Sequence, residues 1–291
     1  MTKAIASPSV RSLAARRGID IDALAGRLGR ETVVREDVVN TMQKSQHGAA
    51  AFWDVDHAAY GPVSEEPIAR ISRVAAKNLS AAQTLIPAVT HHDEAEIGAI
   101  EDLRAKFKLE AANRGTRLTA LAFHVAVLTR CLQEFPRFNA SLSADGEVLV
   151  LKNYCHVGLA VDTPRGLVVP VIRNTDQKGI FAIADDIADL ANRSRENAVR
   201  PEEMGGASMT ITNLGGIGGT AFTPIVNPPE VAILGITRTR FQPVWDGEQF
   251  KPVKMVPLDL SYDHRVIDGA MAARFLAHYA RLIAEPRRLL L

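Results

Sequence analysis

The chain has 291 residues, of which 47% are hydrophobic and 23% charged, enough for one domain of ordinary to large size and a small appendage. Its 34 basic and 33 acidic side chains nearly cancel, which argues against nucleic acid or a charged membrane as the main partner. Cys131 and Cys155 are too few for a disulfide framework, and their apolar surroundings predict buried thiols in a reducing cytoplasm or mitochondrial matrix. No stretch approaches the ~20 apolar residues of a membrane span.

Residues 1–43 are predicted to form a small helical unit. Ser7 or Ser9 can cap a first helix that begins near Pro8 and runs through Arg17, because proline suits the first helical position. A turn of helix is expected at 22–28 and a second helix at 35–42. Residues 1–45 carry eight basic and five acidic side chains, so this unit is basic.

Residues 44–63 show no periodicity and are expected to form a linker or an ordered arm. Beyond them, helical and strand periodicities alternate to the C-terminus. We expect helices near 68–79, 101–114, 118–132, 180–197 and 272–282, and strands near 89–97, 148–152, 157–161, 168–172, 209–212, 231–237 and 256–261. This order predicts an α/β domain at 64–291 whose sheet is mixed rather than doubly wound and parallel.

One histidine stands at a predicted strand-to-helix turn, in the decapeptide LSYDHRVIDG at 260–269. Apolar residues alternate before it and recur at helical spacing after it. Such a turn exposes His264 at the edge of a sheet, where a general base can meet a substrate. An ordinary turn capped by Asp268, with an incidental histidine, is the alternative.

Several other segments accompany this decapeptide in order: FPRFNAS at 135–141, VDTPRGLVVP at 161–170, MTITNLG at 209–215 and GTAFTPIVNPPEVAILG at 219–235. Together they resemble the dihydrolipoamide acyltransferases, the core components of 2-oxo acid dehydrogenase complexes, and are most similar to the pyruvate-type members. The resemblance extends from about residue 64 to the C-terminus. The decapeptide is also similar, more distantly, to the His-x-x-x-Asp-Gly motif of chloramphenicol acetyltransferase.

The resemblance implies a chloramphenicol-acetyltransferase-like two-layer sandwich with a mixed sheet, preceded by a small all-α subunit-binding domain. It implies transfer of an acyl group, with acetyl expected, between dihydrolipoamide and coenzyme A, which is a substrate; no metal is implied. His264 would remove the thiol proton, and Thr212 would donate its hydroxyl to the oxyanion. Asp268 would orient the turn by pairing with an arginine, with Arg265 and Gly269 as structural support.

Thr212 departs from the family, which usually has a serine at this position. Threonine offers the same donor, but its extra methyl stiffens the side chain and crowds the site. The substitution is therefore expected to affect the rate of the reaction more than its type. Other polar residues of the family-like segments are expected to approach the substrate: Asn139, Ser141, Asp162 and Asn213.

The remaining histidines and the glycine-rich run have plainer interpretations. His91 and His92 should point to opposite faces of a strand, a poor geometry for one metal. His124 lies among apolar helical residues and is expected to be a satisfied core histidine. The run at 215–219 lacks the strand–loop–helix context of a phosphate loop, so a flexible turn beside the active site is expected.

The basic helical unit resembles the family's peripheral subunit-binding domain at residues 6–11 and 35–38. Where the family has a glycine-rich turn followed by arginine, this chain has Leu28, Glu31 and Thr32, so the loop is expected to be reshaped and its binding weakened or retuned. The implied partners are the dehydrogenase and dihydrolipoamide dehydrogenase components, with Arg11 at the centre of the interface. A helical arm without a partner is the alternative.

The resemblance also implies a homotrimer in which His264 of one subunit faces Thr212 of its neighbour. Trimers are expected to assemble into a larger shell through the leucines at 289–291, which otherwise fold back on their own core. Nothing before Ala6 can be a lipoyl domain, so the lipoyl group is expected on another chain, in trans, or on a missing domain.

Two other functions stay open. The first is a non-catalytic scaffold that binds partner enzymes through residues 6–43, against which the retention of His264 and Asp268 argues. The second is a stand-alone acetyltransferase acting on a soluble acceptor. Acetyl transfer from acetyl-coenzyme A to free dihydrolipoamide distinguishes both from the acyltransferase core.

Overall fold

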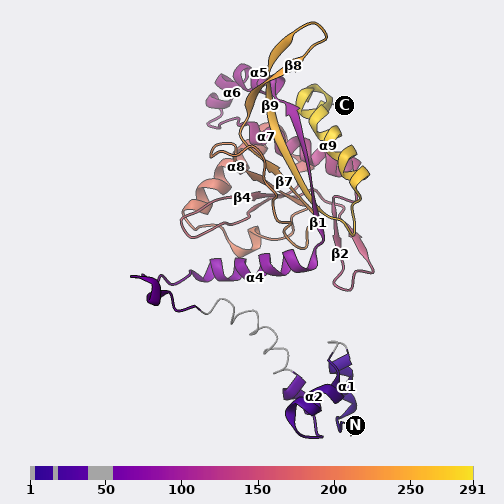
Figure 1. The fold of residues 1–291 in the computed structure, drawn as a ribbon. Helices are drawn as coiled ribbons and strands as arrows, with labels where there is room; N and C mark the ends of the chain where they lie inside the picture. The colour runs from indigo at the N-terminus through magenta and orange to yellow at the C-terminus, as the bar shows by residue number, and fades with distance from the viewer. Residues whose placement is uncertain (1–3, 16–18, 39–54, 291) are drawn as a thin grey trace. The chain divides into compact units, whose positions relative to one another are not determined.

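The computed structural model describes residues 4–15, 19–38 and 55–290, with residue 290 described by its backbone alone, and the chain divides into two compact units (Figure 1). These units comprise Met1–Pro67 and Ile68–Leu291. No helix within the described ranges is long and apolar enough to cross a membrane.

The first unit is a small helical body with its own apolar core. It contains α1 (Pro8–Ala15), α2 (Ile21–Leu28), a helical turn at 35–38 and the 3₁₀ helix η1 (His57–Tyr60). Pro8 begins α1, and the Ser7 hydroxyl accepts a hydrogen bond from the Val10 amide at 3.4 Å. The predicted extensions of the two helices, through Arg17 and through residues 39–42, lie outside the described ranges, as do residues 44–54 of the expected linker.

The second unit is built on a mixed sheet in the order β1-β9-β7-β6-β4-β5, with β8 also paired to β9. Its strands are β1 (Ala88–Glu96), β4 (Val157–Ala160), β5 (Val171–Ile172), β6 (Met209–Asn213), β7 (Ala232–Ile236), β8 (Arg240–Trp245) and β9 (Phe250–Asp263). β4, β6 and β7 run parallel, and the other pairings are antiparallel. A separate hairpin joins β2 (Ala140–Leu142) and β3 (Leu149–Leu151). The predicted α/β class with a mixed sheet is therefore confirmed.

A layer of helices packs on one face of this sheet (Figure 1). The α-helices of the unit are α4 (Arg70–Leu85), α5 (Gly98–Lys106), α6 (Lys108–Asn113), α7 (Ala120–Glu134), α8 (Ile180–Arg195) and α9 (Gly269–Ala284), and the 3₁₀ helices are η2 (Thr175–Gln177), η3 (Pro201–Glu203) and η4 (Pro286–Leu290). α4 lies apart from this layer and buries only Ala82 of its side chains. The amphipathic pattern that predicted α4 is therefore left largely exposed in a single chain.

The two faces of the central strands differ in chemistry because successive side chains of a strand point to opposite faces. Leu258 and Leu260 of β9 belong to the apolar core shared with the helices. Asp259 and Ser261 alternate with these leucines and are also buried, on the other face. This second, polar face also carries His92 and Thr212, which share a cross-strand row with Asp259.

The C-terminal segment turns back toward its own unit. Leu289 in η4 is partly buried and packs against the main core. The alternative in which the terminal leucines fold back therefore describes Leu289, whereas the side chain of Leu290 and all of Leu291 lie outside the described structure.

Candidate active site

His264 follows the last residue of β9 and is held there by its backbone. Its amide donates a hydrogen bond to the carbonyl of Pro87 at 3.1 Å, which ties the turn to the start of β1. The imidazole is exposed, and its ring centre lies 5.9 Å from that of the buried Tyr262. The structure thus presents an accessible imidazole at the end of a buried strand, the arrangement that a general base requires.

A single ion pair joins the two sequence neighbours of His264, Asp263 and Arg265, and stiffens the turn. Asp263 is 2% exposed and accepts hydrogen bonds from the Arg265 amide at 3.0 Å and from its guanidinium at 2.6 and 2.9 Å. This pairing raises the pKa of Arg265 above its ordinary value. Arg265 therefore supports the turn, and Asp263, which the sequence analysis overlooked although it stands beside His264 in the motif, is its partner.

Asp268 begins α9 and satisfies its first turn. Its carboxylate accepts a hydrogen bond from the Met271 amide at 2.7 Å, which is the standard role of an N-cap. Arg265 pairs with Asp263 rather than with Asp268. At Gly269 an added Cβ would meet only the Tyr262 hydroxyl, at 3.9 Å, so no steric demand for glycine is visible there.

Thr212 lies near the end of β6 and is half-buried on the polar face of the sheet. It stands opposite Ala160 of β4 and Gly235 of β7. Its neighbour Asn213 is exposed, and the Asn213 side-chain oxygen accepts a hydrogen bond from the Gly215 amide at 2.9 Å. Asp162, which follows β4, is exposed. Because β4 and β6 are parallel and paired, Asp162 lies at the same end of the sheet as Thr212 and Asn213.

The strand register separates Thr212 from His264 within one chain. Thr212 pairs with Gly235, and Gly235 pairs with Asp259 of β9. His264 lies five residues beyond Asp259, which corresponds to about 17 Å along an extended strand. One chain therefore carries the imidazole at one end of the sheet and the hydroxyl at the other, and does not bring them together.

The two remaining predicted substrate contacts lie at the β2–β3 hairpin. Ser141 is half-buried in β2, opposite Val150. Asn139 is 5% exposed, and its side-chain nitrogen donates to the carbonyls of Lys152 and Tyr154 at 3.1 and 2.8 Å. The donor of Asn139 is thus occupied in fixing the backbone that follows β3.

Several histidines outside the motif have defined partners. His92 pairs with the buried Asp259 at 2.6 Å, in the same cross-strand row as Thr212. His124 bonds the Tyr279 hydroxyl at 2.7 Å, and burial lowers its pKa to about 4, which confirms a satisfied core histidine. Within residues 4–15, 19–38 and 55–290, no cluster of three or more His, Cys, Asp or Glu side chains could hold a metal ion.

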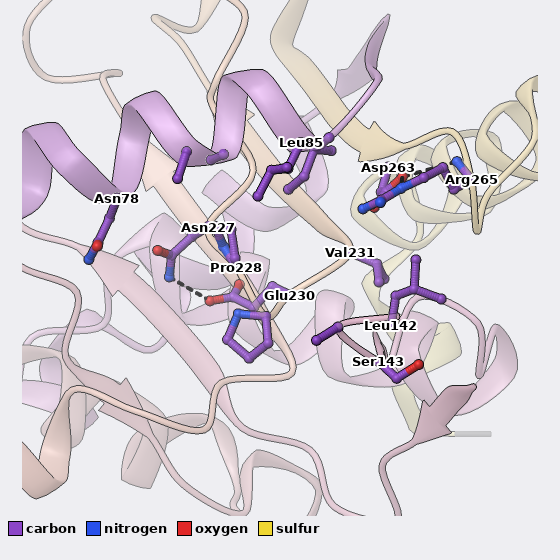
Figure 2. A pocket seen from close by; sticks show the side chains of 15 residues that line it. Asn78, Leu85, Leu142, Ser143, Asn227, Pro228, Glu230, Val231, Asp263 and Arg265 are labelled. Carbon is purple, nitrogen blue, oxygen red and sulfur yellow. Dashed lines mark hydrogen bonds and ion pairs between the residues drawn. The ribbon is translucent and has the colours of Figure 1, made fainter. Parts of the chain in front are cut away.

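A buried carboxyl on the polar face was not anticipated from the sequence. Glu230 is 4% exposed, and its Oε1 accepts hydrogen bonds from the Thr210 hydroxyl at 2.9 Å and the Asn227 side-chain nitrogen at 2.8 Å. Burial raises the pKa of Glu230 to about 7, although these hydrogen bonds and the nearby Lys152 act in the opposite direction. Glu230 lines a cavity of about 630 Å³ that also touches Asp263 and Arg265 (Figure 2).

The fold and the exposed histidine at a strand end define an acyltransferase catalytic domain, and comparison with known families agrees. Residues 60–291 match the family described as 2-oxoacid dehydrogenases acyltransferase (catalytic domain). The chain belongs to this family.

Curated relatives cover nearly the whole chain. It is 43% identical over 303 residues to the dihydrolipoyllysine-residue acetyltransferase component of the pyruvate dehydrogenase complex of Azotobacter vinelandii, covering 99% of this chain and 48% of the relative. The corresponding component of Cupriavidus necator is 41% identical over 305 residues, covering 98% of this chain and 55% of the relative. The chain thus spans about half the length of these relatives.

Solved structures agree with the fold. The cubic core of the pyruvate dehydrogenase multienzyme complex superposes with a TM-score of 0.81 at 48% identity, covering 81% of this chain and 98% of that one. An Azotobacter vinelandii dihydrolipoamide acetyltransferase structure, determined to investigate a serine, a histidine and an asparagine in its catalytic mechanism, has a TM-score of 0.81 at 47% identity and covers 81% and 98% of the two chains.

Proposed function

We propose that this chain transfers an acetyl group between dihydrolipoamide and coenzyme A, as the acyltransferase core of a pyruvate dehydrogenase complex. The observation that carries this proposal is the exposed His264 at the end of β9, clamped by the Asp263–Arg265 pair. In the Azotobacter vinelandii enzyme the investigated serine and asparagine lie at the same sequence intervals from the histidine as Thr212 and Asp268 lie from His264. Threonine and aspartate replace serine and asparagine in this chain.

The residues support a simple thiol-to-thioester reaction. The neutral imidazole of His264 takes the proton of the attacking thiol, and the thiolate sulfur forms a bond to the carbonyl carbon of the acetyl thioester. The carbonyl oxygen becomes an oxyanion that accepts a hydrogen bond from the Thr212 hydroxyl. When the intermediate collapses, the bond to the original sulfur breaks, and the departing thiolate takes the proton back from His264.

The separation of the two groups requires two copies of the chain. We place His264 of one subunit opposite Thr212 of a neighbour in a homotrimer, which completes a site that a single chain leaves divided between two ends of its sheet. In a single chain, apolar side chains along α4 are exposed, including Val74, Leu79 and Leu85. A second copy of the chain would cover this apolar surface.

The direct test is acetyl transfer from acetyl-coenzyme A to free dihydrolipoamide by the purified chain. Transfer supports the acyltransferase, whereas a folded chain with no transfer favours a non-catalytic scaffold. A stand-alone acetyltransferase is distinguished by offering a lipoyl domain in trans: the proposed core acetylates its dihydrolipoyl group, and a stand-alone enzyme does not.

The N-terminal unit is proposed to bind the dehydrogenase and dihydrolipoamide dehydrogenase components. Arg11 is exposed on α1, and its guanidinium also donates to the carbonyl of Ala4, so the same side chain stabilises the unit. Calorimetry of the full chain with each partner should show binding that weakens with salt and with Arg11→Ala. Binding unaffected by both changes would contradict this interface.

Larger assembly is proposed from the solved cubic core of a pyruvate dehydrogenase complex, a structure similar to this chain. Trimers would join through the C-terminal segment, and the lipoyl group would arrive on a lipoyl domain elsewhere in the protein or on another chain. Light scattering that gives a mass of many trimers supports this assembly, and a bare trimer contradicts it. The reducing compartment implied by the free, buried cysteines is the cytoplasm, or the matrix in a mitochondrion.

A further inference from the structure

The cavity beside the catalytic turn is lined by two pairs of polar side chains (Figure 2). Asp263 and Arg265, which flank His264 in sequence, line it on one side. Asn227 and Glu230 line it on another side, beneath α4. The Asp263 amide donates to the Val231 carbonyl at 2.8 Å. Glu230 precedes Val231 in sequence and therefore lies close to the catalytic turn.

Glu230 determines how the Asn227 amide is oriented. Only the nitrogen of an asparagine side chain can donate a hydrogen bond, so the bond from Nδ2 to Glu230 Oε1 fixes which end faces the carboxyl. The carbonyl oxygen Oδ1 is consequently turned away, as Figure 2 shows, and no described residue donates to it. Both Thr210 and Asn227 donate to Oε1, so the orientation is the same whether or not Oε2 carries a proton.

The acceptor is preorganised for a neutral donor. Glu230 is buried, and its amide donates to the Asn227 carbonyl at 3.0 Å, so the two residues form one rigid turn. A phosphate or carboxylate would meet acceptor oxygens at this wall and be repelled, whereas an N–H group would be bound. Leu85, Ile86 and Leu142 supply apolar walls for a methylene chain.

Both substrates of the proposed reaction offer this chemistry, because the thiol-bearing arms of coenzyme A and of dihydrolipoamide each contain an amide N–H. We propose that Asn227, oriented by Glu230, accepts a hydrogen bond from the amide of a substrate arm lying in this cavity, an inference that rests on the proposed acyl transfer. Asn227 is then a binding residue and Glu230 a positioning residue.

The test compares amide and ester substrates in wild type and Asn227→Ala. For the lipoyl arm the pair is dihydrolipoamide and methyl dihydrolipoate, and for the coenzyme A arm it is N-acetylcysteamine and 2-mercaptoethyl acetate. Loss of one neutral hydrogen bond should raise the KM of the amide by about tenfold, with kcat nearly unchanged and the KM of the ester unaffected. The pair that responds identifies the arm that enters the cavity.

Asn192→Ala, which removes an amide from α8, is the matched control and should leave every KM at its wild-type value. Asn227→Ser, which can still donate to Glu230 but lacks the carbonyl, should reproduce the loss if the alanine variant is unstable. An active wild type whose variants change amide and ester KM equally, or change neither, overturns this inference alone. A folded wild type without acetyl transfer overturns the proposed function and this inference with it.

Discussion

Thr212 and His264 lie at opposite ends of the same sheet. Thr212 is level with Asp259 across β7, and His264 follows the end of β9, about 17 Å further along the strand direction. A hydrogen-bond donor and a base that act on one tetrahedral intermediate must lie within a few ångströms of each other. The catalytic unit is therefore larger than one chain if both residues act.

His264→Ala should lower kcat for acetyl transfer by about 10²–10⁴, the usual contribution of a positioned base. The His264 imidazole is exposed, so the variant should unfold at the wild-type temperature and keep its oligomeric mass. Steady-state kinetics with calorimetry and light scattering measure these effects. Near-normal turnover by a folded variant would falsify the assignment.

Thr212→Ala should lower kcat by about 10²–10³ with a smaller effect on KM, since it removes one donor to the oxyanion. Thr212→Ser keeps the hydroxyl, removes the methyl and should remain active. The contrast between the two variants is decisive, because equal activities would show that the hydroxyl is not the donor.

Mixing the two inactive chains tests whether the site is shared. Trimers assembled at random from equal amounts of His264→Ala and Thr212→Ala chains should recover about one quarter of wild-type activity, because that fraction of interfaces combines an intact histidine with an intact threonine. Co-expression with different tags allows the mixed trimers to be purified and assayed. If mixed and unmixed trimers are equally inactive, each site lies within a single chain.

Glu230→Gln should change how stability depends on pH. The pKa of Glu230 is raised from 4.5 to about 7, so between these values the unfolded chain releases a proton that the folded chain retains, and stability falls as pH rises. The glutamine variant lacks this loss. As pH rises from 5 to 8, the difference in free energy of unfolding between variant and wild type should therefore shift by about 1–3 kcal/mol in favour of the variant.

Denaturant titrations of wild type and variant at both pH values measure this gain. Glu248→Gln, in the exposed turn between β8 and β9, is the control and should follow the wild type. A Glu230→Gln variant that also follows the wild type would show that the buried carboxyl titrates normally.

Periodicity predicted most of the catalytic domain because its central elements have one clearly apolar face. The helix at 118–132 and the strands at 209–212 and 231–237 were found as α7, β6 and β7. β8 and the first part of β9 were missed, since this hairpin is largely exposed on both faces and includes Pro243 and Pro252, so no alternation marks it. β2 was missed because its residues, Ala-Ser-Leu, include no β-branched or aromatic side chain of the kind that favours strands.

The site was predictable only where the chemistry is local in sequence. The placement of His264 at a strand end followed from the pattern on either side of it. The role of Glu230 depends on Thr210, which a separate strand delivers, and the division of the site depends on the order of β6, β7 and β9. The hydrophobic pattern of one segment does not show which other strand it pairs with or in which register.

The split between Thr212 and His264 also has a genetic consequence. In the proposed trimer, a chain that has lost both Thr212 and His264 inactivates the two sites that it shares with its neighbours, even when those neighbours are intact. A cell that makes a mixture of normal and damaged chains would then lose more activity than the share of damaged chains. A chain that carries both mutations should consequently behave as partly dominant, whereas mutations that prevent the chain from folding, and so from joining a trimer, should be recessive.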